Sequence, residues 1–159
     1  MESIRENPIG GFSIIAFIIV LTISMAYFQF IYLPQINAKP HVSEKILNPT
    51  TITEVSIMEG SALPSNPQFY VPKEARASLE VSNKVVWTNN DKTAHTITSD
   101  TGYVDKISGP FDTMKVEGVG LLTPGKTFEF LFTHEGEYPY HCEPHPWMTG
   151  MVKIVKDFS

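Results

Sequence analysis

Residues 138–150 read YPYHCEPHPWMTG and place three potential metal-binding side chains at regular intervals. Cys142, His145 and Met148 follow one another at every third position. A thiolate, an imidazole and a thioether form a soft-to-borderline ligand set. Mononuclear copper sites that transfer electrons use one cysteine, two histidines and a weak axial methionine. The stretch therefore predicts a copper centre that lacks only a second histidine.

His95 is the best candidate for that second histidine. It follows a hydrophobic strand and a turn, which read VVWTNND at residues 85–91. A ligand at the end of a strand, with the others on one loop, gives a compact site on a rigid scaffold. Pro144 and Pro146 brace that loop, and such rigidity reduces the rearrangement between Cu(II) and Cu(I). The arrangement is thus suited to electron transfer.

Cys142 is the one cysteine of the 159-residue chain. This count excludes an internal disulfide, thiolate-rich zinc sites, four-cysteine iron–sulfur clusters and a dinuclear copper centre bridged by two cysteines. A nucleophilic cysteine is disfavoured, because catalytic Cys/His pairs are normally brought together by the fold. His141 precedes Cys142 on a strand, so its side chain is expected on the opposite face. Met151 is the weaker choice as axial ligand, since the strand that begins there turns it elsewhere.

Short segments with alternating apolar and polar residues occupy the region around this loop. Turn sequences such as Thr123-Pro124-Gly125 separate them. About seven short strands in about 105 residues predict an all-β sandwich. The stretch 101–122 is long for a connection without structure, which is typical of functional loops. The candidate strands are residues 53–59, 77–81, 84–89, 96–99, 127–132, 137–141 and 151–155.

The N-terminal segment is of a different kind. Residues 9–33 contain no charged residue or histidine. As a helix, these 25 residues span roughly 37 Å, enough to cross a ~30 Å hydrocarbon core. Aromatic residues crowd its C-terminal end, and Pro34 is expected to end the helix. A cleaved signal peptide is the alternative, but the segment is too long, and Ala38, the nearest cleavage candidate, has Ile36 two positions before it.

Three regions follow from these patterns. Residues 1–34 are predicted to form a transmembrane anchor, residues 35–50 a polar linker, and residues 51–159 the copper domain. His41 is interpreted as a linker residue and His134 as a surface residue. The formal net charge of -5 argues against a nucleic-acid partner, which requires a basic surface.

The motif around Cys142 resembles the ligand loop of the cupredoxins, and within them the amicyanin and plastocyanin-like type with a short loop. Residues 86–97 resemble the family's first-histidine segment, and residues 124–128 its turn before the strand that leads to the cysteine strand. This resemblance implies a Greek-key β-sandwich with one mononuclear type 1 copper, bound by His95, Cys142 and His145 with Met148 axial. Two features depart from the family: Thr96 stands where Asn is frequent, and 47 residues separate His95 from Cys142.

The predicted function is that of a membrane-anchored blue copper protein, which transfers single electrons between redox proteins at the membrane or cell surface. An enzyme is the first alternative: a copper with an open axial position that reacts with nitric oxide, superoxide or dioxygen. Copper delivery or storage is the second, although a rigid Cys/His/His/Met site favours retention. An accessory role in a terminal oxidase is the third.

The cellular compartment of the copper domain is inferred from the copper site rather than from the charges that flank the apolar segment. Arg5 precedes the apolar segment and Lys39 and Lys45 follow it, so the positive-inside rule does not choose an orientation. Copper with a reactive thiolate is usually kept outside the cytoplasm. We therefore predict the copper domain on the extracytoplasmic face of the cell membrane.

Overall fold

The computed structural model describes residues 8–37 and 42–157. The chain divides into two units, residues 1–40 and residues 41–159. His41 and part of the predicted linker lie outside the described residues.

The N-terminal unit is a continuous helical segment: α1 (Pro8–Tyr27), a π-helical turn η1 (Phe28–Tyr32) and α2 (Leu33–Asn37). The part from Ile14 to Asn37 is long and apolar enough to cross a membrane or to serve as a signal sequence. The expectation that Pro34 ends the helix is wrong. In the turn before it, the Leu33 N–H donates to the Phe28 carbonyl five residues back. This wider turn offers room for a proline ring, which lacks an N–H and would clash in a regular helix.

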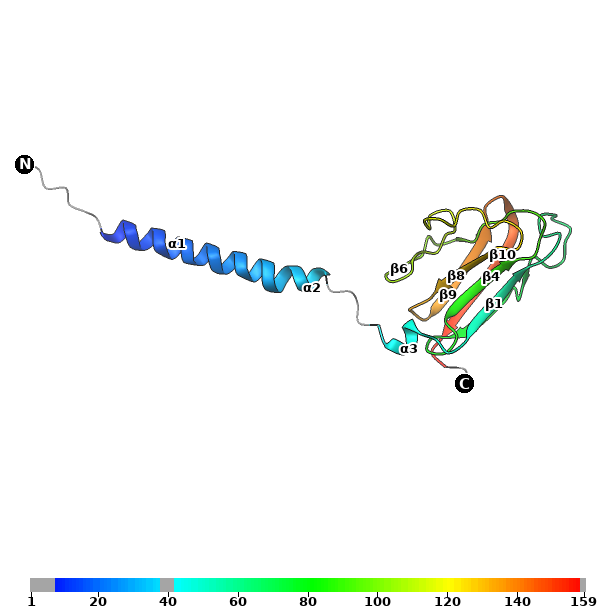
Figure 1. Cartoon of the computed structure of the whole chain (residues 1–159), viewed down its shortest axis with the longest axis horizontal. Coiled ribbons are helices and arrows are strands. Elements are labelled where there is room, and N and C mark those ends of the chain that lie inside the picture. Colours follow the sequence, from blue (N-terminus) through cyan, green and yellow to red (C-terminus); the bar gives the residue numbers. More distant parts are fainter. Residues whose placement is uncertain (1–7, 38–41, 158–159) are drawn as a thin grey trace, which may run out of the picture. The chain divides into compact units, whose positions relative to one another are not determined.

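The C-terminal unit is a sandwich of two four-stranded sheets, which confirms the predicted fold class (Figure 1). One sheet has the order β2-β1-β4-β8 and the other β3-β10-β9-β5. Within each sheet one pair is parallel, β1 with β4 and β3 with β10. The strands are β1 (Ile52–Ile57), β2 (Tyr70–Val71), β3 (Glu74–Ser78), β4 (Lys84–Asn89), β5 (Thr98–Ser99), β8 (Thr127–Leu131), β9 (Gly136–Cys142) and β10 (His145–Val155).

Residues 101–122 contain a small hairpin, β6 (Val104–Asp105) with β7 (Gly109–Pro110), and a series of turns. The last residue of this segment, Leu122, is hydrogen-bonded to the sandwich at His95. Leu122 and His95 exchange both backbone hydrogen bonds, at 2.9 and 3.1 Å. The long connection is therefore not structureless, and its last residues support the first candidate ligand.

Alternating side chains from both sheets fill the space between the layers. Trp87 of β4 is central: its ring lies 5.5 Å from the rings of both Phe111 and Tyr140. Trp87 and Tyr140 are fully buried, and so are Cys142 and Met148. Two of the candidate copper ligands, Cys142 and Met148, therefore belong to the hydrophobic core.

The chain enters the sandwich at the end far from this site. A single helical turn, α3 (Glu44–Leu47), lies within the predicted linker. The buried amide of Asn83 donates to the Ile46 carbonyl at 2.9 Å and to the Phe132 carbonyl at 2.7 Å. Since β4 runs from Lys84 toward the site, α3 is held at the opposite end of that strand.

Gly150 lies directly opposite Tyr140 in the β9–β10 ladder. A Cβ atom at this position would lie 2.4 Å from the Tyr140 Cζ atom, which cannot retreat within a packed core. We expect Gly150→Ala to lower the free energy of unfolding by about 1–3 kcal/mol, as overpacked cores do. Gly136→Ala is the matched control, because its nearest contact, at 3.2 Å, requires only a small shift. Equal urea midpoints for the two variants would contradict this packing argument.

Asp105 is a buried carboxylate at the end far from the site. It accepts hydrogen bonds from the Tyr103 hydroxyl, from the N–H groups of Ile107 and Ser108, and from both the N–H and the hydroxyl of Thr133. Burial raises the pKa of Asp105, but these hydrogen bonds outweigh burial and bring the pKa below its usual value.

The lowered pKa of Asp105 predicts a specific pH dependence of stability. The ionised carboxylate stabilises the fold above the usual aspartate pKa of about 3.9, and this contribution is lost as pH falls through the lower pKa of the folded state. We expect Asp105→Asn to cost about 1–3 kcal/mol at pH 7, because donors lose their acceptor. Urea unfolding from pH 6 down to about pH 3 is expected to show a shallower loss for the variant than for the wild type. Parallel curves would refute the role of the carboxylate.

Candidate metal centre

One end of the sandwich brings three potential ligands together. Cys142 is the last residue of β9 and His145 the first residue of β10, and the two are paired across the turn between these strands. His95 follows β4 and is held by its ladder contact with Leu122. The β9–β10 register shifts between His145 and Thr149, so the residues between them form a bulge.

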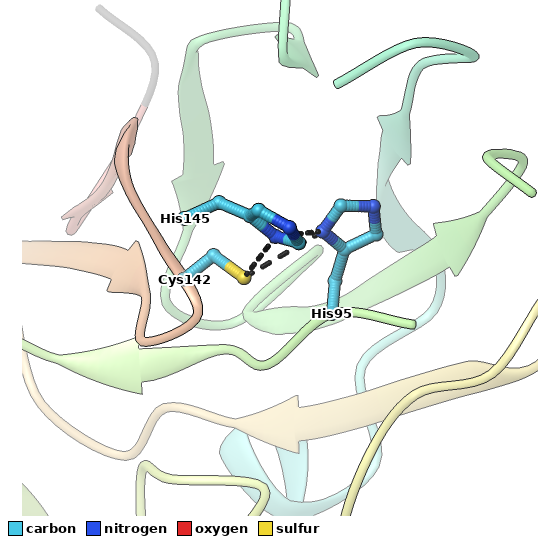
Figure 2. Close-up of side chains that lie close together, drawn as sticks. All are labelled: His95, Cys142 and His145. Carbon is cyan, nitrogen blue, oxygen red and sulfur yellow. Dashed lines mark hydrogen bonds between the residues drawn. The ribbon is translucent and has the colours of Figure 1, made fainter. Parts of the chain in front are cut away.

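The three donor atoms face one another (Figure 2). The Cys142 sulfur lies 3.6 Å from His95 Nδ1 and 3.5 Å from His145 Nδ1, and the two nitrogens are 3.1 Å apart. In a triangle with these sides, the point equidistant from the corners lies about 2.0 Å from each, which matches a metal–nitrogen bond and is about 0.3 Å shorter than a metal–sulfur bond. The residues therefore fit one metal ion bound by one sulfur and two nitrogens.

A hydrogen bond to the ring nitrogen that faces away from the cluster fixes the orientation of His95. Its Nε2 lies 2.8 Å from the buried Asp91 carboxylate, which leaves Nδ1 directed at the cluster. Asp91 also accepts hydrogen bonds from the N–H groups of Gly60, Ala62 and Lys92. Burial raises the pKa of Asp91, but these contacts outweigh it and lower the pKa below its usual value. A carboxylate that holds the far nitrogen of a histidine is a common support in metal sites.

The electrostatics favour a neutral imidazole and a protonated thiol before metal binds. Burial lowers the pKa of His95, and nearby His145 adds to this, while the hydrogen bond to Asp91 opposes it. Burial raises the pKa of Cys142, although hydrogen bonds from Thr96 oppose the shift. A metal ion deprotonates a coordinating thiol outright, so binding displaces that proton.

Thr96, the departure from the family pattern, connects the two ligand segments. Its N–H donates to the Cys142 sulfur at 3.3 Å, and its hydroxyl accepts the Glu143 N–H at 2.8 Å. A hydroxyl thus joins the first-histidine segment to the residue after the cysteine. Hydrogen bonds to the sulfur of a copper centre tune its redox potential.

Met148, the predicted axial ligand, is fully buried on β10 and belongs to the same hydrophobic core as Cys142. His141 lies on the other face of β9, where its Nδ1 is 2.5 Å from Asp100 Oδ1, as its place before the cysteine predicts. Trp147 lies beside His145, with ring centroids 5.5 Å apart.

Two parts of the chain that support the site are not predicted by any sequence pattern. Asp91 stands in a stretch with turn chemistry, and only its spacing of four residues before His95 hints at a role. The loop after β1, which supplies the N–H groups of Gly60 and Ala62, carries no recognisable signal at all.

Comparison with known proteins agrees with the geometry. Residues 65–156 match the family described as copper binding proteins, plastocyanin/azurin family. The chain is 30% identical to amicyanin-alpha of Methylorubrum extorquens over 106 residues, which is 67% of this chain and 74% of that protein. It is 33% identical to amicyanin of Paracoccus denitrificans over 78 residues, 48% of this chain and about half, 52%, of that protein.

Among solved structures, a purple cupredoxin from Nitrosopumilus maritimus shares 29% identity, with 64% of this chain and 98% of that chain covered at a TM-score of 0.49. The family match covers more than half of the chain and includes the segments of His95, Cys142 and His145. Cupredoxins bind a single type 1 copper, and the cluster of one sulfur and two nitrogens fits it. The chain therefore belongs to the cupredoxins, the plastocyanin/azurin family of copper-binding proteins.

Proposed function

We propose that this protein is a membrane-anchored electron carrier in which His95, Cys142 and His145 bind one copper ion, with Met148 as the axial ligand. The observation that carries the proposal is the triangle of one sulfur and two Nδ1 atoms, with sides of 3.1–3.6 Å. When bound, the copper supplies a one-electron Cu(II)/Cu(I) couple. The residues of the chain hold the donor atoms in place and exclude water from most of the site.

The burial of the ligands supports electron transfer over reaction with a small-molecule substrate. His95, Cys142 and Met148 are fully buried, and His145 alone of the four is partly exposed. An electron can therefore enter through the exposed edge of the His145 ring, whereas a small molecule has no open path through the other ligands. Redox proteins that dock at this end are the proposed partners.

The spectrum of the full chain tests the copper assignment. Copper(II)-loaded protein in detergent is expected to show an intense visible sulfur-to-copper band that ascorbate bleaches and ferricyanide restores. Met148→Ala is expected to retain the band and change the copper hyperfine splitting in EPR. A copper-loaded wild type without the band would exclude a type 1 centre, and an unchanged EPR spectrum in Met148→Ala would exclude the axial role.

We infer that residues 1–34 anchor the chain, that residues 35–50 connect the anchor to the copper domain of residues 51–159, and that this domain lies on the extracytoplasmic face. The support is the apolar helix Ile14–Asn37, in which no side chain is buried. Retention of the intact chain in carbonate-washed membranes, with the copper domain digested by protease added to spheroplasts, is expected. Release of a shortened chain into the medium would show a cleaved signal sequence instead.

A further inference from the structure

The loop between β1 and β2 contacts both histidine-bearing segments through three consecutive residues. On one side, the N–H groups of Gly60 and Ala62 donate to the two Asp91 carboxylate oxygens, at 2.9 and 3.3 Å. The same carboxylate lies 2.8 Å from His95 Nε2. The Asp91 carboxylate therefore links residues 60–62 to His95 by hydrogen bonds on both sides.

On the other side, the same loop reaches the ligand hairpin. The indole Nε1–H of Trp147 donates to the Ser61 carbonyl at 3.2 Å. Ser61 is fully buried, and its hydroxyl lies 2.6 Å from the Met58 carbonyl and 3.0 Å from the Phe69 carbonyl. The acceptor for the indole is therefore on a segment that is itself held in place.

The Trp147–Ser61 hydrogen bond lies where the pairing between β9 and β10 is interrupted. The β9–β10 ladder is interrupted between His145 and Thr149, and Trp147 lies in the middle of that bulge. Its ring packs beside the His145 ring, with an angle of 56° between the planes. A bulge redirects side chains at the expense of ladder hydrogen bonds, so an outside contact has more influence here than within a regular strand.

We propose that residues 60–62 form a clamp that fixes the separation of His95 and His145, and that Trp147 is the positioning residue through which the clamp holds His145. The clamp rests on the proposed copper coordination. It joins the two histidines by a path that bypasses Cys142: His95 to Asp91, Asp91 to residues 60–62, and Ser61 to Trp147. The histidine nitrogens are thereby held in place whether or not a metal joins them.

Trp147→Phe tests the clamp, because it keeps an aromatic ring beside His145 and removes the N–H donor. In the copper(II)-loaded full chain we expect the visible band to persist with a shifted maximum. Release of copper to excess EDTA is expected to accelerate about 3- to 10-fold, which corresponds to the loss of one neutral hydrogen bond. In the metal-free chain, amide exchange at Gly60 and Ala62 is expected to accelerate as well.

An isosteric replacement separates the hydrogen bond from packing. β-(3-Benzothienyl)alanine at position 147 keeps the bicyclic shape without the N–H, and is expected to release copper as fast as Trp147→Phe. The same replacement at Trp87 is the matched control, since the Trp87 Nε1–H is buried without a hydrogen-bond partner among the described residues. That control is expected to release copper at the wild-type rate.

The outcomes distinguish the clamp from the copper assignment. If both variants at position 147 release copper at the wild-type rate and leave amide exchange unchanged, the clamp is wrong while the copper centre stands. If the wild type never develops the visible band, the copper centre is wrong. In that case, the amide exchange rates of Gly60 and Ala62 in the metal-free chain are the measurement that tests whether Trp147 stabilises residues 60–62.

Discussion

Cys142→Ser is expected to eliminate the intense visible band of the copper-loaded chain. The band requires charge transfer from a thiolate sulfur, and a serine hydroxyl remains protonated and binds copper weakly. The Cys142 sulfur is one corner of the cluster, 3.6 and 3.5 Å from the two histidine nitrogens, and it is the one sulfur of that group. Among the described residues, the group formed by Cys142 and the two histidines is the one arrangement of this kind.

The measurement is a copper(II) titration followed by visible absorption and EPR. His141→Ala is the control, since this residue neighbours Cys142 in sequence but lies on the opposite face of β9, beside Asp100. We expect the control to keep both the band and the narrow copper hyperfine splitting. A blue Cys142→Ser variant would refute the assignment of the thiolate.

Asp91→Asn is expected to weaken copper binding about 10- to 100-fold, the usual cost of removing a carboxylate behind a metal-binding histidine. At present Oδ1 accepts from Gly60 and Lys92, while Oδ2 lies against the Ala62 N–H and His95 Nε2. An amide replaces one of these oxygens by a donor, which then faces N–H groups. The His95 ring consequently loses its fixed orientation.

Competition with a chelator of known affinity measures this loss on the full chain. Asp105→Asn is the matched control, because Asp105 is likewise buried and accepts backbone N–H groups, yet lies at the other end of the sandwich. The control is expected to unfold more easily and to bind copper as the wild type does. Equal affinities for the two variants would show that Asp91 has no special role.

The sequence predicts the parts of this protein that depend on local pattern. Strand β4 has the predicted bounds, 84–89, because alternation and the following turn define both ends. The spacing of Cys142, His145 and Met148 identifies the ligand hairpin without knowledge of the rest of the fold.

Elsewhere, contacts between distant segments decide the structure. The strand predicted at 77–81 lies at Glu74–Ser78, since its register is set by parallel pairing with β10. Strand β10 begins at His145 rather than at residue 151, because the bulge that follows lets the ligand loop pair with Cys142. The Trp147–Ser61 hydrogen bond joins residues 86 positions apart, which no local pattern reveals.

The uneven placement of the candidate ligands along the chain affects how copper and folding are coupled. Cys142, His145 and Met148 lie within seven residues, whereas His95 is 47 residues before the cysteine. An unfolded chain already presents the three near donors to copper, but recruiting His95 requires closure of a long loop. Binding to the unfolded chain subtracts from the stabilisation that a metal gives to the folded one. In the proposed centre, copper therefore raises the melting temperature mainly through its bond to His95. An unfolded chain can also keep copper bound to the three neighbouring donors.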